Sequence, residues 1–212
     1  MRGVLLPIIL MVAAGRTDWL RGWLFWLVMM ASFAACSVAA HRKNPGLFRA
    51  RMEKPAGTKP FDRVILAIMS VGFAAIVILA GLGARFNWSS LSFRWVFPGL
   101  LLQILGMIPI GLAMAANPFL ERTVRIQNDR GQVVVTSGPY RIVRHPMYVG
   151  ALLVVAAWPL LLGSVWSFIP LAVIAPALIV RTALEDRTLH RELAGYADYA
   201  QRTRYRLLPG VW

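Results

Sequence analysis

The amino-acid sequence predicts an all-α polytopic membrane protein with about five to six transmembrane helices. Hydrophobic residues make up 58% of the 212 residues, charged residues make up only 15%, and the mean hydropathy is +0.61. This composition is typical of integral membrane proteins. The charged residues gather in loops, so the formal net charge of +14 lies at the borders of apolar runs. That distribution argues against a nucleic-acid-binding domain.

Four apolar runs in the first half of the chain predict the amino-terminal helices. The run at 4–14 would be only about 16 Å long as a helix, against a hydrocarbon core of about 30 Å. We interpret it as a short first membrane helix rather than a cleaved signal peptide. The runs at 22–40, 64–83 and 95–116 are long enough to span the membrane. The basic segment at 41–63 is interrupted by prolines and a glycine, and is predicted to be a loop.

The last apolar run, at 147–180, holds thirty-four residues without a charge. A single helix of that length would measure about 51 Å, which exceeds the thickness of the hydrocarbon core. A Gly-Ser pair at 163–164, between two prolines, supplies a turn. The run is therefore predicted to be a tight hairpin of two helices of about sixteen residues each. Such a hairpin brings the segments at 117–146 and 181–212 to the same side of the membrane.

Charge also predicts how the chain lies in the membrane. The loops at 41–63, 117–146 and 181–212 carry most of the net positive charge, whereas those at 16–21 and 84–94 carry little of it. Basic residues favour the cytoplasmic side of a membrane. Both termini and the long loops are therefore assigned to the cytoplasm.

A polar segment at 138–150, GPYRIVRHPMYVG, stands where a charged loop enters the hairpin. Pro146 suits the first turn of a helix and biases His145 toward an extended conformation. The free amides and the dipole of a helix start favour anionic groups, while Tyr140 and Tyr148 add aromatic faces. The segment is either a small-molecule site or a basic anchor at the membrane boundary. Its residues alone leave both interpretations open.

Two further candidates follow the hairpin. Arg181 and Glu185 are four residues apart and lie on one helical face, either as functional residues or as a simple helix ion pair. A metal site is not indicated, because the three histidines are scattered and the single cysteine, Cys36, lies inside an apolar run. The sequence contains no Walker loop, HExxH or Gly-x-Gly-x-x-Gly motif.

The motif TSGPYRIVRHPMYVG is followed, after the hairpin, by R-x-x-x-E-D-x-x-L and a tyrosine-rich tail ending in LLPG. Together they resemble the isoprenylcysteine carboxyl methyltransferase family, which belongs to a wider group with the phospholipid N-methyltransferases. The resemblance implies a membrane-embedded fold that binds S-adenosylmethionine from the cytosol and takes a lipophilic methyl acceptor laterally from the bilayer. It divides the chain into amino-terminal transmembrane helices, 1–116, and a methyltransferase core with a cytoplasmic cofactor pocket, 117–212.

The resemblance also implies roles for individual residues. It places Arg181 beside the methyl acceptor, as the catalytic candidate, and it implies no metal. The implied cofactor-binding residues are Gln127, Gln132, Val133, Val134, Val135, Tyr140, His145, Pro146, Met147, Tyr148 and Glu185. Two positions depart from the family pattern. Gln132 stands where the prenylcysteine enzymes often have histidine, and Asp186 replaces the second glutamate of a Glu-Glu pair.

The implied function is a membrane methyltransferase that uses S-adenosylmethionine, with a prenylcysteine-type carboxylate as the favoured acceptor. A phospholipid amine or a small thiol would use the same cofactor pocket, so a phospholipid N-methyltransferase and a thiol S-methyltransferase are alternatives. Two other classes stay open. One is an NADPH enzyme of the sterol-reductase kind, which shares a related carboxy-terminal hairpin, and the other is a non-catalytic membrane protein.

Overall fold

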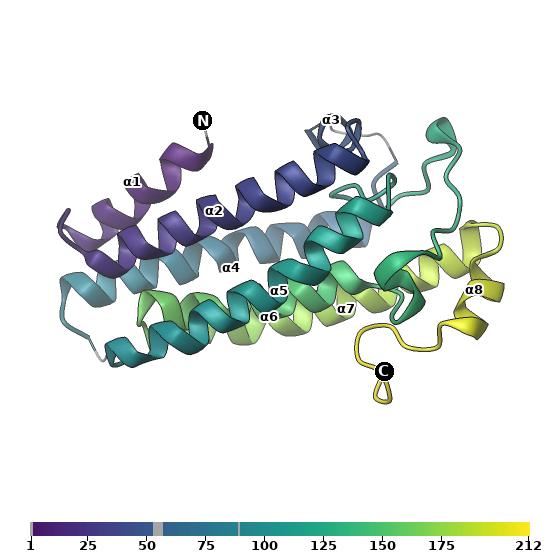
Figure 1. The fold of residues 1–212 in the computed structure, drawn as a ribbon. Helices are drawn as coiled ribbons and strands as arrows, with labels where there is room; N and C mark the ends of the chain where they lie inside the picture. Colours follow the sequence, from purple (N-terminus) through teal and green to yellow (C-terminus); the bar gives the residue numbers. More distant parts are fainter. Residues whose placement is uncertain (1, 53–56, 89) are drawn as a thin grey trace.

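The structure, a computed structural model, describes residues 2–52, 57–88 and 90–212, and within these residues the protein is helical without a β-strand. Its long helices run side by side in an elongated bundle (Figure 1). Those long and apolar enough to cross a membrane are α2 (Leu20–Lys43), α4 (Pro60–Arg85), α5 (Val96–Ala116, preceded by the turn η1, Phe93–Trp95) and α7 (Phe168–Glu192). Two shorter apolar helices are α1 (Arg2–Ala14) and α6 (Pro146–Leu162). The prediction of an all-α protein is confirmed, and four of the described helices are candidates to span a membrane.

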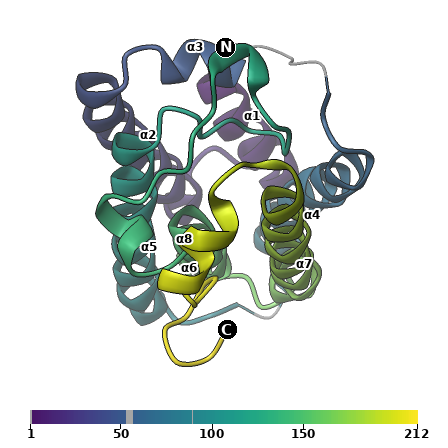
Figure 2. The same ribbon diagram turned by 90° about the vertical axis from the view of Figure 1, so that its right-hand side faces the viewer.

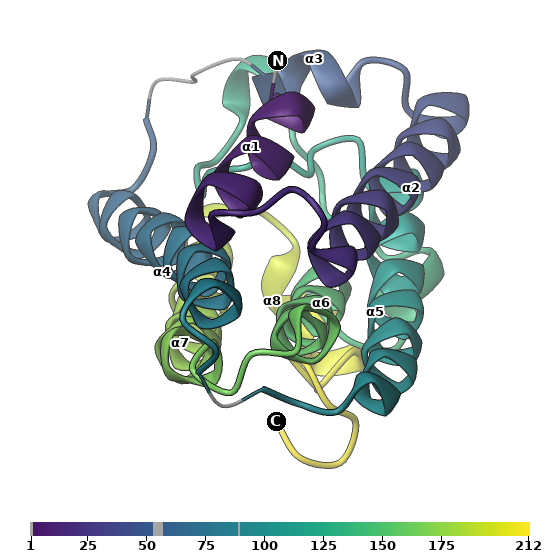
Figure 3. The same cartoon turned by 90° about the vertical axis from the view of Figure 1, so that its left-hand side faces the viewer.

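The helix α6 lies in the middle of the bundle, with α4 and α7 on one side and α2 and α5 on the other (Figure 3). It packs most closely against α5, where two glycines let the backbones approach each other. A Cβ atom at Gly106 would lie 2.7 Å from the carbonyl oxygen of Gly150. Small residues at a helix crossing are a common means of close packing in membranes. The central helix is therefore held in place by backbone contact as well as by side chains.

The predicted hairpin is present but is less even than expected. The helices α6 and α7 are antiparallel, and α6 ends at Leu162, just before Gly163, which has a positive φ of 71°. The helices have 17 and 25 residues rather than similar lengths, because no glycine or proline interrupts the sequence between Pro176 and Gly195. The main partner of α6 is α5 rather than α7. The last turns of α7 therefore carry charged residues alongside the start of α6.

The prediction of a loop throughout 41–63 was wrong. The helix α2 continues to Lys43, because the basic residues in its last turn interact favourably with the helix dipole. A short helix, α3 (Leu47–Met52), follows, and α4 already begins at Pro60. Residues 53–56 of the predicted loop lie outside the described residues.

One end of the bundle collects the long connecting segments. The helices α2, α5 and α7 finish there, and α4 and α6 begin there (Figure 1). The segments 117–145 and 193–212 cover this end (Figure 2). Their short elements are η2 (Asn128–Arg130), η3 (Gly138–Arg141) and α8 (Tyr196–Arg202). The polar segments before and after the hairpin thus meet, as the hairpin prediction required.

Candidate functional site

A cavity of about 830 Å³, counted with its open mouth, lies at this end of the bundle. It is enclosed by the loop after α5, the start of α6, the end of α7 and α8. All the residues that the sequence analysis selected line it: Gln127, Gln132, Val133, Val134, Val135, Tyr140, His145, Pro146, Met147, Tyr148, Arg181 and Glu185. They form one site, whatever its ligand.

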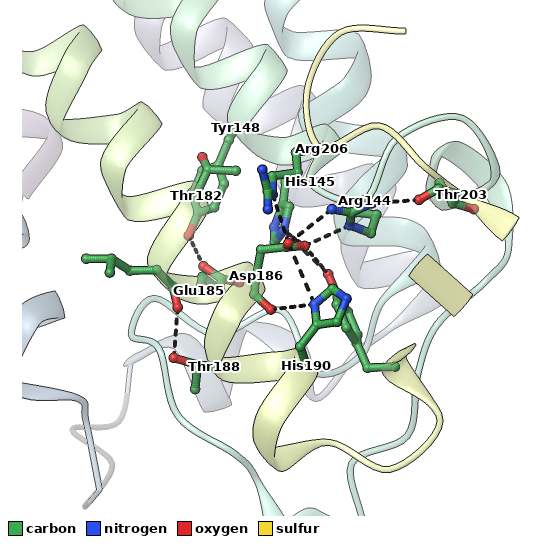
Figure 4. Close-up of polar contacts among 12 residues, drawn as sticks. Arg144, His145, Tyr148, Thr182, Glu185, Asp186, Thr188, His190, Thr203 and Arg206 are labelled. Atoms are coloured by element: carbon green, nitrogen blue, oxygen red, sulfur yellow. Dashed lines mark hydrogen bonds and ion pairs between the residues drawn. The ribbon is translucent and has the colours of Figure 1, made fainter. Parts of the chain in front are cut away.

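Tyr148, Arg181 and Glu185 lie together on one wall of the cavity. The hydroxyl of Tyr148 donates a hydrogen bond to the carboxylate of Glu185 (Figure 4). The guanidinium of Arg181 lies 5.4 Å from the centroid of the Tyr148 ring, and the His145 ring stacks near the same ring at a centroid distance of 5.8 Å. Arg181 and Glu185 thus share a helix face, as predicted. They meet at Tyr148 instead of forming a simple helix ion pair.

Arg181 is held by an acid that the sequence analysis did not select. Its Nε donates to Oδ1 of Asp62 at 2.7 Å, and its Nη2 donates to the carbonyl oxygen of Arg122 at 2.7 Å. Asp62, near the start of α4, is fully buried and accepts a further hydrogen bond of 2.8 Å from the amide of Val124. Because an unpaired buried charge is costly, Asp62 fixes both Arg181 and the loop at Val124. It lies 119 residues before Arg181, and its local sequence does not distinguish it from the other charges of its segment.

Asp186 is the centre of a buried network beside the cavity (Figure 4). Its carboxylate accepts hydrogen bonds from Arg144 at 2.7 and 3.0 Å, Arg206 at 2.8 Å and Tyr196 at 2.9 Å, and lies 3.2 Å from Nε2 of His145. Burial, and then the charge of Asp186, raise the pKa of Tyr196. The network ties the start of α6 to α8 and the tail. Asp186 does not line the cavity, so we interpret it as a positioning residue.

The start of α6 has the geometry that the sequence predicts. His145 precedes the helix with a φ of −126° and a ψ of 60°, and Pro146 occupies its first position. The amide of His145 donates to the carbonyl oxygen of Arg206 at 3.0 Å, which anchors the helix start to the tail. The amide of Met147 has no acceptor among the described residues. It is therefore available to a ligand at the helix start.

Gln127 and Gln132 shape the loop of the cavity. The carboxamide of Gln127 donates to the carbonyl oxygen of Phe119 at 2.6 Å and accepts from Arg130 at 2.7 Å. The amide of Gln127 donates to Oε1 of Gln132 at 2.8 Å. The backbone groups of residues 133–135, by contrast, make no hydrogen bond to any part of the chain that the structure describes. The two glutamines hold the loop in place, and the segment after them offers free backbone groups to the cavity.

An aromatic cluster closes the side of the cavity nearest α8. Tyr140, Tyr196 and Tyr199 pack together with Leu189 and Leu193. The hydroxyl of Tyr199 donates to the carbonyl oxygen of Tyr140 at 2.7 Å. Burial raises the pKa of Tyr199 to about 12 and also raises the pKa of Tyr140. These phenols therefore stay protonated at neutral pH.

Other residues that line the cavity were not selected from the sequence: Asn117, Phe119, Leu120, Glu121, Thr123, Val124, Arg125, Arg144, Leu189, Leu193, Tyr196 and Tyr199. Seven of these twelve lie in the segment 117–126, which carries no motif. In this segment, Oγ1 of Thr123 is buried without a hydrogen-bond partner among the described residues. Buried polar groups are normally paired, so this hydroxyl is a candidate to meet a ligand or water.

A comparison with known families settles the family of the chain. A family model described as phospholipid methyltransferase matches residues 95–194, from the start of α5 to just beyond the end of α7. The chain belongs to the phospholipid methyltransferase family. This result confirms the resemblance predicted from the two motifs. Together with the apolar helices, it indicates an integral membrane protein of a methyltransferase family.

Two curated proteins are similar in sequence to this member of the phospholipid methyltransferase family. One is the cobalt-zinc-cadmium resistance protein CzcN of Cupriavidus metallidurans, 36% identical over 157 residues that cover 70% of the chain and 68% of the relative. Another is the nickel-cobalt-cadmium resistance protein NccN of Alcaligenes xylosoxydans xylosoxydans, 31% identical over 134 residues that cover 61% of the chain and 58% of the relative. Within the described residues, no three His, Cys, Asp or Glu side chains gather to hold a metal ion.

Proposed function

We propose that the protein is an integral membrane methyltransferase that uses S-adenosylmethionine to methylate a lipophilic acceptor at the membrane boundary. Family membership supports the reaction class. The convergence of the sequence-selected residues on one cavity supports the cofactor. The observation that carries the proposal is the wall formed by Tyr148, Arg181 and Glu185, where an oriented carboxylate and a fixed cation face the same cavity.

The residues present fit the cofactor. S-adenosylmethionine, when bound, supplies an activated methyl group on a sulfonium, together with an amino-acid head and an adenosine. The carboxylate of Glu185, oriented by Tyr148, suits the ammonium group or the ribose hydroxyls. The free amide of Met147 suits the carboxylate of the amino-acid head. The free backbone groups of 133–135 and the unpaired hydroxyl of Thr123 suit the remaining polar edges.

The chain contributes mainly by positioning the acceptor and excluding water. Displacement at a methyl group needs little acid–base help when the acceptor is already anionic, so alignment and desolvation supply most of the acceleration. Arg181, held by Asp62 and packed on Tyr148, is fixed in place to orient such an acceptor. This favours a prenylcysteine-type carboxylate. The family description favours a phospholipid amine as the second candidate, and an amine must reach the site neutral or lose a proton there.

The proposal also places the cavity on the cytoplasmic side. The basic loops predicted to be cytoplasmic lie at the same end of the bundle as the cavity (Figure 1). The cofactor is water-soluble and enters from this side. The acceptor enters from the bilayer between the helices.

The test uses the purified protein in detergent. S-adenosylhomocysteine should raise the melting temperature and NADPH should not. Labelled S-adenosylmethionine, incubated with prenylcysteine, phospholipid and thiol acceptors, should label one of these classes. A thermal shift with NADPH alone would support the reductase class instead. The absence of both a thermal shift and a labelled product would support a non-catalytic membrane protein.

A further inference from the structure

A second arginine approaches the loop that carries Arg181. Arg51, in α3, donates from Nη1 to the carbonyl oxygen of Leu120 at 2.6 Å and to that of Glu121 at 3.4 Å. Arg181 donates from Nη2 to the carbonyl oxygen of the next residue, Arg122, at 2.7 Å. Two guanidinium groups from opposite halves of the sequence therefore bind three consecutive carbonyls. Leu120 and Glu121 line the cavity, so this loop joins the arginine pair to the site.

Two acids near this loop, Asp62 and Glu121, are already paired, and a third, Glu185, lies with Arg181 at the Tyr148 ring. Asp62 accepts from Arg181 and from the amide of Val124. Glu121 accepts two hydrogen bonds of 2.8 Å from Arg125. Burial, and then the positive charges of Arg122 and Arg181, lower the pKa of Arg51. Among the described residues, Arg51, Arg122 and Arg181 thus bring three positive charges to the loop 120–122, against the carboxylates of Asp62 and Glu185.

We propose that Arg51 is a specificity-determining residue that, together with Arg181, binds the anionic group of a lipophilic methyl acceptor. This inference rests on the proposed function. The hydrogen bonds described above use Nη1 of Arg51 and two of the three nitrogens of Arg181, and a guanidinium offers five N–H donors in a planar fork. The fork matches a carboxylate or a phosphate in two-point contact. Thr123, with its unpaired buried hydroxyl, adds a third polar group next to the same carbonyls.

The position of α3 suits an acceptor held by its tail in the bilayer. The helix follows α2 directly at the end of the bundle where the charged loops gather (Figure 1). Under this proposal, a lipid whose chain lies among the membrane-spanning helices reaches Arg51 and Arg181 with its headgroup. An anionic headgroup at this point balances the excess positive charge, whereas a neutral headgroup leaves that charge unbalanced. The arginine pair thus selects anionic acceptors over neutral ones.

The experiment measures lipid binding rather than turnover. Wild-type protein and Arg51→Gln, in a nonionic detergent, are titrated with oleate, oleoyl lysophosphatidate and the neutral monooleoylglycerol, and the dissociation constants are measured by native mass spectrometry. Arg63→Gln is the matched control, because Arg63 is exposed in the first turn of α4 at the same end of the bundle. The affinity for S-adenosylhomocysteine is measured for every variant by calorimetry.

Arg51→Gln should weaken the binding of the anionic lipids by about tenfold or more, since hydrogen bonds to charged groups are the stronger ones. Binding of the neutral lipid and of S-adenosylhomocysteine should stay within about twofold of wild type. A larger loss for oleate would identify a carboxylate acceptor, and a larger loss for lysophosphatidate would identify a phosphate. Arg51→Lys keeps the positive charge and should retain the preference for anionic over neutral lipid.

Equal losses in Arg51→Gln and Arg63→Gln would overturn the proposal, because they would reflect only the general charge of this surface. Unchanged binding of the anionic lipids in Arg51→Gln would overturn it as well. Loss of S-adenosylhomocysteine binding in both Arg51→Gln and Arg51→Lys would assign Arg51 to the folding of the loop alone. Failure of the wild-type protein to bind S-adenosylhomocysteine is a separate result, which refutes the proposed function.

Discussion

Substitution of Glu185 tests the proposed cofactor pocket most directly. Its carboxylate is half-buried, lines the cavity and accepts a hydrogen bond from Tyr148. In Glu185→Gln the side chain keeps its size, and the amide oxygen still accepts from Tyr148. The substitution therefore removes only the negative charge that Glu185 presents to the ligand. Because a hydrogen bond to a charged group contributes about 1.5–3 kcal/mol, the dissociation constant of S-adenosylhomocysteine should rise by about 10- to 150-fold.

The assay is isothermal titration calorimetry of the detergent-solubilised protein, with the melting temperature of each variant as a check on folding. Glu192→Gln is the matched control, since Glu192 lies on the same helix and makes a surface ion pair of 2.7 Å with Lys59. A surface ion pair contributes at most about 1 kcal/mol to stability, so this variant should bind the ligand as wild type does. An affinity of Glu185→Gln within about twofold of wild type, with an unchanged melting temperature, would refute the assignment of Glu185.

Three other changes test the supports of the cavity. Asp62→Ala leaves the buried guanidinium of Arg181 unpaired, so the free energy of unfolding, measured by denaturant titration, should fall by about 3–5 kcal/mol. Gly150→Leu places a side chain against the carbonyl of Gly106, so it should separate α5 from α6 and lower the melting temperature by several degrees. The pKa of Tyr199 is raised to about 12 from 10.0, so its contribution to stability is complete below pH 10 and is lost as the pH rises toward 12. Tyr199→Phe should therefore reduce the loss of stability over this pH range, measured by thermal unfolding followed by circular dichroism.

Each of these predictions has a control in the same chain. Asp18→Ala removes an exposed ion pair with Arg16 and should leave the free energy of unfolding nearly unchanged. Gly46→Leu meets open space and should have little effect on the melting temperature. Equal effects at the buried and exposed positions would contradict the assigned contacts. An unchanged alkaline transition in Tyr199→Phe would show that other groups control it.

The carboxyl-terminal half of the site was predictable because its residues occur in two short continuous motifs. The segment 138–150 and the pair Arg181 and Glu185 each have local spacing that indicates a helix start or a helix face. The apolar run between them is too long for one span, which places both at the same end of the bundle. A turn of known position was therefore sufficient to predict that the two motifs lie at the same end of the bundle.

The amino-terminal contributions were not predictable from the sequence. Arg51 and Asp62 lie in a basic segment that looks like an ordinary cytoplasmic loop, and their roles depend on tertiary contacts with residues 120–124 and Arg181. The carboxyl-terminal end of α7 was not predicted either, for a different reason. Hydropathy falls at the first charged residue, whereas a helix ends only where backbone hydrogen bonding stops, at Glu192.

Under the proposed function, the residues that bind the cofactor and those that set the acceptor come from different parts of the sequence. The residues proposed to bind the cofactor lie within 127–148 and at Glu185, inside the family match of 95–194. Arg51 and Asp62, which set the charge and the position of Arg181, lie outside that match. Substitutions before residue 95 can therefore change how the acceptor is bound, while the residues proposed to bind the cofactor stay in place. This separation gives a physical route by which members of one methyltransferase family acquire different acceptors.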